Sequence, residues 1–557
     1  MNIPTFKYTL IVSLFFLSVT AQSQDKKNEN TTGTQSANIT EEIEVIRPYK
    51  PVLADAVKIR RNPDMNSAKA FKPVLSYSVI DKKLNLNSNI KELQAQKMAD
   101  ERLSILSNNY IKVGAGNFNT AQAEAYFNSG RDAALQTGAY FKHLSQQGNL
   151  EKQEFSNQEL GIFGKSVADS YSISGNLSYD RRSTFFYGFV PSSNASIDKS
   201  KQGFSTIAAE AEIMNNYSQS STFNYVASIN AYQFSNIEDA RESSILLKGY
   251  FNKEISLFNV GVNTSADFTS TKDATYNLGN NILRANPYVN LKGKGYDLIL
   301  GANIVQEFGA NSRLNIFPSV SAEIPLIPEY AIVFAGLNGD VLKTSLRDLA
   351  LENPFLNKNL AIKNSLESIN VQAGVKGNVG AEFGYKIMGY YKNIDDMQLL
   401  VNNQTIVNRF DVIYDNGTST IFGLEGELNV KASDVFSIGG KAQIFKYDLA
   451  NQTHAWFKPT VRLISNARAQ VNQKLFLDTE LLFQGETFAR VNTTAGSGFS
   501  SSTLKGFIDL SVGAEYKVHN KIGVYLRANN LTGQPYQRYL YYPKMGLTLL
   551  GGANYSF

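Results

Sequence analysis

PKMGLTLLGGANYSF, residues 543–557, alternates in character along its length and finishes on an aromatic side chain. Every second position is apolar or small, and the positions between are small or polar apart from Leu550. The apolar parity consists of Met545, Leu547, Leu549, Gly551, Ala553, Tyr555 and Phe557. Successive side chains of a strand point to opposite faces, so the pattern predicts a two-faced strand. Such a strand suits a soluble sandwich or the wall of an outer-membrane barrel, whose side chains alternately face lipid and lumen.

The sequence from about residue 109 to residue 557 repeats this pattern, and we count about 22 strands with polar, glycine-containing connections. In the segments 421–431, 505–518 and 521–529 the charged residues keep to one parity, which in a barrel is the lumen side. The predicted lumen-facing residues are Glu425, Glu427, Asp509, Glu515 and Arg527. The predicted fold is therefore an all-β, transmembrane, antiparallel up-and-down barrel that occupies 109–557.

The connections between these strands alternate in length when they are counted back from Phe557. The long ones include 531–542, 485–503, 448–454, 393–407 and 343–368, and upstream 270–280, 236–243, 190–203 and 146–157. The short ones include 519–520, 472–473, 431–434, 379–380 and 327–330, while 309–312 and 118–120 are short where a long one is expected. Outer-membrane barrels have short periplasmic turns and longer external loops, whereas a soluble sandwich has no reason to sort its loops. The alternation favours the barrel and predicts that both termini are periplasmic.

The first 21 residues have the features of a secretory signal peptide. Lys7 precedes the apolar run YTLIVSLFFL at 8–17, and Val19, Thr20 and Ala21 form a small-residue cleavage site. The run is too short to cross a bilayer as a helix. Residues 22–40 are polar and are predicted to be a linker. We expect an exported protein in the outer membrane of a Gram-negative bacterium, in contact with outer-membrane lipid.

The sequence contains no pattern that points to catalysis or to a cofactor. It has no cysteine and three histidines, His143, His454 and His519, none of which stands at a metal-ligand spacing. The net charge of +5 forms no long basic run, so nucleic-acid binding receives no support. We expect neither an enzyme nor a bound metal or cofactor.

The tail from 522 to 557 resembles the last hairpin of TonB-dependent outer-membrane receptors. An apolar strand ends in Asn530 and Leu531, and an aromatic-rich loop leads to Pro543 and a closing strand that finishes on Phe557. The resemblance covers the barrel from residue 109 onward and implies a strand number of 22. It also implies that the closing strand carries the barrel insertion signal, which we assign to Leu549, Tyr555 and Phe557.

Residues 41–108 form a predicted extended arm, periplasmic or lumenal, with two candidate partner-binding features. Its start is similar to the box that these receptors offer to the periplasmic TonB protein by strand addition, here Glu42, Ile43, Glu44, Val45 and Ile46. The second feature is a repeat, Lys50, Pro51, Val52 and Leu53 recurring as Lys72, Pro73, Val74 and Leu75. Proline disfavours helix and central strand, so each copy suits an extended docking segment, and chance similarity of a short motif stays open.

The arm departs from the family at the place where members carry a globular plug. Residues 47–108 are about half the length that the resemblance implies for a plug and lack its glycine-rich strands. The resemblance therefore leaves two functions open. One is transport of a bulky substrate through the barrel, driven by a TonB-type energiser. The other is a non-transporting scaffold subunit whose periplasmic arm docks other outer-membrane or periplasmic proteins. An open porin fits least, because so wide a barrel would leak unless something filled it.

Overall fold

The structure of the protein is a computed structural model that describes residues 109–557 except 131, 133, 189–196, 217–222, 257, 381, 434 and 493–497. The signal peptide at 1–21, the linker at 22–40 and the arm at 41–108 lie outside the described residues. The box-like 42–46 and both Lys-Pro-Val-Leu copies therefore stay predictions. The described part of the chain contains no helix long and apolar enough to span a membrane.

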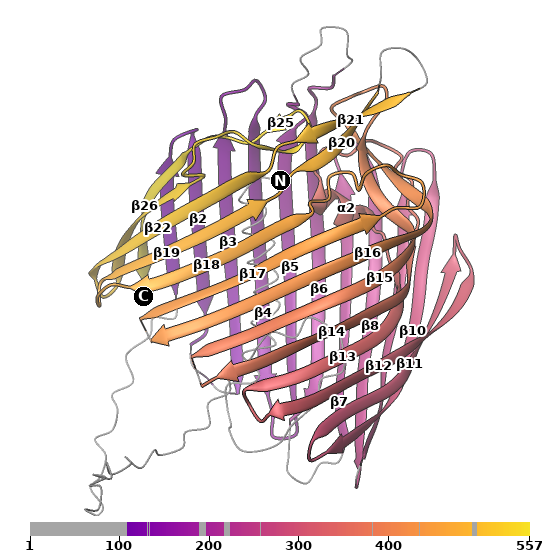
Figure 1. Ribbon diagram of the computed structural model, residues 1–557. Helices are drawn as coiled ribbons and strands as arrows, with labels where there is room; N and C mark the ends of the chain where they lie inside the picture. Colours follow the sequence, from indigo (N-terminus) through magenta and orange to yellow (C-terminus); the bar gives the residue numbers. More distant parts are fainter. Residues whose placement is uncertain are drawn as a thin grey trace, which may run out of the picture. The chain divides into compact units, whose positions relative to one another are not determined.

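The described residues form a closed antiparallel barrel of 22 strands (Figure 1), which confirms the predicted fold. In the first half the strands are β1 (Tyr110–Gly116), β2 (Thr120–Asn128), β3 (Leu135–Gln147), β4 (Glu154–Val167), β5 (Tyr171–Phe185), β6 (Lys201–Asn215), β7 (Phe223–Asn236), β8 (Arg241–Ile255), β9 (Phe258–Lys272), β10 (Asn277–Gly293) and β11 (Tyr296–Gly309). In the second half they are β12 (Arg313–Ile327), β13 (Ala331–Leu342), β14 (Ser365–Val379), β15 (Phe383–Asn402), β16 (Phe410–Ser433), β17 (Phe436–Asp448), β18 (Val461–Gln470), β19 (Leu475–Gln484), β22 (Phe507–His519), β23 (Ile522–Asn529) and β26 (Thr548–Ser556).

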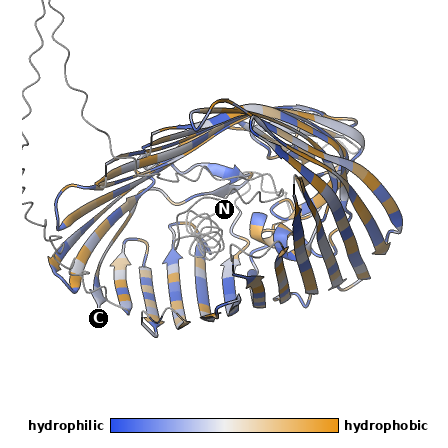
Figure 2. Ribbon diagram, turned by 90° about the horizontal axis from the view of Figure 1, so that it is seen from below, coloured by the Kyte–Doolittle hydropathy of each residue, from blue (hydrophilic) through white to orange (hydrophobic). Residues whose placement is uncertain are grey.

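Each strand pairs with its neighbours in the sequence, and β1 closes the ring by pairing with β26 from Tyr110 opposite Ser556 to Gly116 opposite Leu550. Two small hairpins, β20 (Thr487–Asn492) with β21 (Phe499–Leu504) and β24 (Gln537–Tyr539) with β25 (Tyr542–Pro543), stand outside the ring order. One short helix, α2 (Leu346–Glu352), lies inside the ring of strands in Figure 2.

The closing strand β26 has the two faces that its sequence predicts. Leu549 and Tyr555 are each 43% exposed on the outward face, whereas Leu550 and Asn554 are each 6% exposed and point inward. Met545 does not continue the outward face, because it is buried in the connection before β26, where its carbonyl accepts a hydrogen bond from Asn530 Nδ2. The alternation therefore begins later than the sequence suggests.

The two ends of the barrel differ in their connections. We call the end that carries Asn109 and Phe557 the terminal rim and the opposite end the loop rim. The longest connections, 186–200, 343–364, 449–460, 485–506 and 530–547, all join strands that end at the loop rim. Five expected long connections are shorter: 403–409, 343–364, 273–276, 237–240 and 148–153 replace 393–407, 343–368, 270–280, 236–243 and 146–157. In each case the flanking strands stay paired further than their polar residues suggest, and β15 and β16 continue past a bulge at Asp395.

Many inward aromatic rings lie flat on the wall instead of projecting into the lumen. A side chain placed at Gly161 would meet the ring of Tyr140 within 2.4 Å, and one at Gly423 would meet the ring of Tyr390 within 2.0 Å. Tyr288 covers Gly261 in the same way. These glycines give the rings room to pack on the neighbouring strand.

Candidate functional site

A buried apolar cluster at the loop rim joins several of its connections, and we call it the closure core. It comprises Phe186, Phe204, Phe234, Ala240, Leu346, Leu349, Ala350, Phe355, Leu356, Leu360, Leu400, Phe410, Val412, Tyr539 and Tyr542. These residues come from the loop-rim ends of β6, β7, β15 and β16 and from four connections, 186–200, 237–240, 343–364 and 530–547. Connections of a barrel usually lie in solvent, so a shared buried core shows that these turn inward and pack on one another.

The closure core joins opposite sides of the ring. Phe186 follows β5 and Phe410 begins β16, and the ring places β6–β15 between these strands on one side and β17–β19, β22, β23, β26 and β1–β4 on the other. Both side chains are fully buried. Tyr542, from the last connection, stacks on Phe355 with ring centroids 3.5 Å apart and meets Tyr187 edge-on at 5.0 Å. Aromatic contacts of this kind stabilise beyond the area they bury.

Hydrogen bonds from the tyrosine hydroxyls fix the positions of these aromatic rings. The Tyr542 hydroxyl donates to the carbonyl of Asn408 at 2.5 Å, and the Tyr539 hydroxyl donates to the carbonyl of Glu352 at 2.7 Å. The Tyr187 hydroxyl donates to the carbonyl of Pro543 at 3.3 Å. Burial raises the pKa of the Tyr187 and Tyr539 hydroxyls, so both remain protonated donors at neutral pH.

An arginine with two carboxylate partners lies beside the closure core. Arg409 Nε donates to Asp198 Oδ2 at 2.8 Å, and Arg409 Nη2 donates to Glu238 Oε1 at 2.7 Å. The Asn408 side chain donates to the carbonyl of Asp198 at 2.6 Å and accepts from its backbone N–H at 2.9 Å. Lys358 also pairs with Glu238, at 3.3 Å. The connections 186–200, 237–240, 343–364 and 403–409 thus share one polar cluster.

Helix α2 is anchored to the wall by Glu242 of β8. The fully buried Glu242 carboxylate accepts from the backbone N–H groups of Leu346 and Arg347 at 2.8 and 3.2 Å. Tyr232 and Thr271 donate to the same carboxylate at 2.8 and 2.7 Å. A carboxylate at a helix N-terminus complements the unpaired N–H groups and the helix dipole. Glu242 therefore fixes α2 where its apolar residues enter the closure core.

A second buried carboxylate, Asp415 of β16, holds the connection 449–460. It accepts from the backbone N–H groups of Ala450, Asn451 and Gln452 at 2.7, 2.8 and 2.9 Å. Gln452 accepts from the indole N–H of Trp456 at 3.0 Å. Trp456 is fully buried in a neighbouring apolar cluster with Ile394, Met397, Leu399, Val401 and Ile421. The two clusters meet at Phe457, which packs against both.

The residues predicted to face the lumen are paired with other groups of the wall. Glu425 and Glu427 are brought together on Lys441, at 2.6 and 2.8 Å. Asp509 pairs with Lys544 at 3.2 Å and accepts from the Tyr536 hydroxyl at 2.6 Å.

The other two residues predicted to face the lumen, Glu515 and Arg527, also have polar partners. Glu515 accepts from Asn554 Nδ2 at 2.9 Å, and Arg527 pairs with Asp478 and Glu480 at 3.1 and 2.9 Å. The structure does not gather the five residues into one site, and their role in passage stays a prediction. Leu549, Tyr555 and Phe557 lie on the exposed outward face, and their role in insertion likewise stays a prediction.

The sequence did not point to the closure core, to Arg409 or to Glu242. The available signal was the density of Tyr, Phe and Asn in the long connections, but it does not say which connections meet. Among the described residues, no group of three or more His, Asp or Glu side chains could hold a metal ion.

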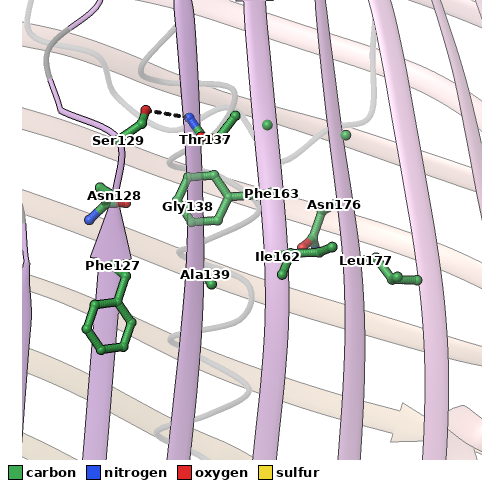
Figure 3. Close-up of a pocket in the computed structure, with 12 residues that line it drawn as sticks. Phe127, Asn128, Ser129, Thr137, Gly138, Ala139, Ile162, Phe163, Asn176 and Leu177 are labelled. Atoms are coloured by element: carbon green, nitrogen blue, oxygen red, sulfur yellow. Dashed lines mark hydrogen bonds between the residues drawn. The ribbon is translucent and has the colours of Figure 1, made fainter.

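The outward face of β2–β5 has a shallow hollow of about 700 Å³ (Figure 3). The small residues Gly164 and Gly175 line it, beside the exposed side chains of Phe127, Ile162 and Leu177. The hollow is shallow and opens to the outside of the ring, so it gives no separate functional site.

Comparison with known proteins identifies the fold but no relative in sequence. No family model and no curated protein matches the chain. The pyoverdine outer membrane receptor FpvA from Pseudomonas aeruginosa matches with a TM-score of 0.63 and 11% identity over 81% of this chain and 79% of that one. The siderophore receptor PirA from Acinetobacter baumannii matches with a TM-score of 0.62 and 12% identity, over 82% and 81%. The FrpB iron transporter from Neisseria meningitidis matches with a TM-score of 0.63 and 11% identity, over 82% of each.

These similar structures are transport receptors and not enzymes. The chain therefore has the fold of the barrel of TonB-dependent outer-membrane receptors. At this level of identity the likeness concerns the fold.

Proposed function

We propose that the chain is an outer-membrane barrel of a Gram-negative bacterium, sealed by its own loops and used as a scaffold subunit of a protein assembly. In this proposal the loop rim faces the outside and both termini lie in the periplasm, where the arm at 41–108 docks partner proteins. The observation that carries the proposal is the closure core, in which connections from opposite sides of the ring bury one another.

The burial in the closure core makes spontaneous opening rare. Phe186, Phe355, Leu356, Phe410 and Tyr542 are all buried. Re-exposing one such side chain costs about 2 kcal/mol, so separating the five would cost on the order of 10 kcal/mol. A tenfold change in population corresponds to about 1.4 kcal/mol, so spontaneous separation of the closure core is rare. This supports a sealed barrel over an open porin.

Co-purification in mild detergent tests the scaffold role. The native barrel should be recovered with stoichiometric partner proteins. Replacing Val52, Leu53, Val74 and Leu75 by Asp should release these partners, because an extended docking segment loses its apolar contacts. Four Asp substitutions within 22–40 are the matched control and should leave the partners bound. A native barrel recovered alone and at full yield would contradict the proposal.

The second candidate is energy-driven transport, and the likeness of the barrel to siderophore receptors and an iron transporter favours it. Transport needs the closure to open and needs a periplasmic energiser to bind the box-like segment. Substituting Ile43 or Val45 by Pro should then abolish uptake of a bulky nutrient, because proline prevents strand addition. Unchanged uptake in both variants would remove this candidate.

A further inference from the structure

We propose that Arg409 is the latch of the loop rim, and that releasing its two carboxylates opens the closure and turns the sealed barrel into a pore. The inference rests on the closure core and goes beyond the scaffold role, because it assigns a conformational device to one side chain. Arg409 is 5% exposed, and its partners Asp198 and Glu238 are 20% and 11% exposed. The cluster is thus shielded from the solvent that weakens surface ion pairs.

The position of this ion cluster in the ring sets it apart from the pairs of the wall. Arg284 pairs with Asp340 between β10 and β13, and Lys441 pairs with Glu427 on adjacent strands. Such pairs stay together whether the loop rim is open or closed. Arg409 instead joins the connection 403–409 to two connections on the opposite side of the ring, so opening must separate it from both partners.

The contacts around Arg409 link its release to the aromatic core. Its guanidinium lies over the ring of Phe186, 4.2 Å from the ring centroid. The preceding residue, Asn408, bonds the backbone of Asp198 through both the nitrogen and the oxygen of its side-chain amide, and its backbone carbonyl accepts from the Tyr542 hydroxyl. Removing the guanidinium leaves two carboxylates close to each other, with Lys358 as the cation that remains on Glu238. Their mutual repulsion and the lost cross-rim bonds act in the same direction.

The experiment compares Arg409→Gln with Arg284→Gln in planar lipid bilayers at neutral pH. Gln removes the positive charge in both variants, but only Arg409 pairs with carboxylates on the opposite side of the loop rim. The native protein and the Arg284→Gln variant should remain almost silent, and Arg409→Gln should raise the mean conductance by at least about tenfold, since a barrel this wide conducts strongly when open. A folded Arg409→Gln barrel that stays silent would overturn the proposal.

A second readout follows opening without an ion current. The chain has no cysteine, so Ala350→Cys places a single thiol in α2, inside the closure core. Its reaction with a maleimide should be at least about tenfold faster in the Arg409→Gln background than in the native or Arg284→Gln background, because a buried thiol reacts only in the open state. Equal rates in the three backgrounds would also overturn the proposal.

A folding control separates a latch from general damage. Each barrel is checked by its resistance to unfolding in cold detergent. If Arg409→Gln does not fold, the double variant Asp198→Asn with Glu238→Gln removes both partners without leaving a carboxylate unpaired, and it should open the barrel in the same assays. Partner recovery should be unchanged in the latch variants, so loss of partners and failure of the latch are distinguishable results.

Discussion

At the scale of single residues, Asp198 determines how the closure responds to pH. Burial raises the pKa of Asp198, and hydrogen bonds from the Ser200 backbone N–H and from Arg409 lower it. The lowering is the larger effect, so the pKa of Asp198 lies below its usual value. A carboxylate with a lowered pKa stabilises the folded closure above its unfolded pKa of about 3.9, and this stability is lost as the pH falls through the lower folded value. The closure should therefore hold at neutral pH and loosen only in acid.

Trp456 gives a direct measurement of this pH dependence. It is the single tryptophan of the chain and is fully buried in the cluster that meets the closure core at Phe457. Its emission should stay constant from neutral pH down past the unfolded pKa of about 3.9. It should shift to the red only in stronger acid, where the pH falls through the lowered pKa of Asp198. A red shift centred near pH 6 would instead assign the control to a histidine.

Glu242 is the residue on which the position of α2 depends. Glu242→Gln keeps the shape but replaces a charged acceptor of four hydrogen bonds by an amide, one end of which is a donor. The loss of the charge at the helix N-terminus should cost about 1–2 kcal/mol. Hydrogen exchange of the α2 amides measures it, and an increase of about tenfold is expected at α2 with unchanged exchange in β22 and β23. Unchanged exchange at α2 would show that packing alone holds the helix.

At the scale of elements, the effect of replacing a glycine of the wall depends on whether that glycine faces inward or outward. In β16, a side chain at Gly423 would collide with the inward ring of Tyr390, whereas a side chain at the outward Gly426 would meet nothing within 4 Å. Gly423→Val should destabilise the barrel by about 1–3 kcal/mol, because Tyr390 must leave its place on the wall. Gly426→Val, the matched control, should be neutral or stabilising, because valine favours a strand. The midpoint of urea unfolding in detergent distinguishes the two, and equal shifts would contradict the account.

The strands could be predicted from the sequence, whereas the closure core could not. Alternation along β26 and β22 identifies the lipid face, because lipid and lumen impose opposite polarity on successive residues. The closure core has no such period. Phe186, Phe355 and Tyr542 lie in three connections and Phe410 begins β16, all remote from one another in sequence. Their contacts depend on the diameter of the ring and on the inward turn of each connection. Strand propensity and residue alternation say nothing about the ring diameter or the path of a connection. The closure core therefore could not be predicted, although the barrel could.

At the scale of the whole molecule, the ring is completed by the last residue. The backbone N–H and carbonyl of Phe557 bond the carbonyl and N–H of Asn109 at 3.0 and 2.9 Å, which extends the pairing of β26 with β1. Deleting Phe557 should remove these bonds and one exposed aromatic of the predicted insertion signal. We expect the amount of assembled barrel in the membrane to fall several-fold, measured by quantitative immunoblotting of folded protein, with Ser556→Ala as the unaffected control. Normal assembly without Phe557 would exclude it from the signal.

The closure core also sets an order for biogenesis. It needs Phe186 from the early part of the chain and Tyr542 from the connection that precedes the final strand, so it cannot be complete until nearly the whole chain has been added to the wall. At every earlier stage the closure core is incomplete. Completion of the closure core is therefore one of the last events of folding, and a chain that stalls before the connection 530–547 lacks the contribution of Tyr539 and Tyr542 to that core.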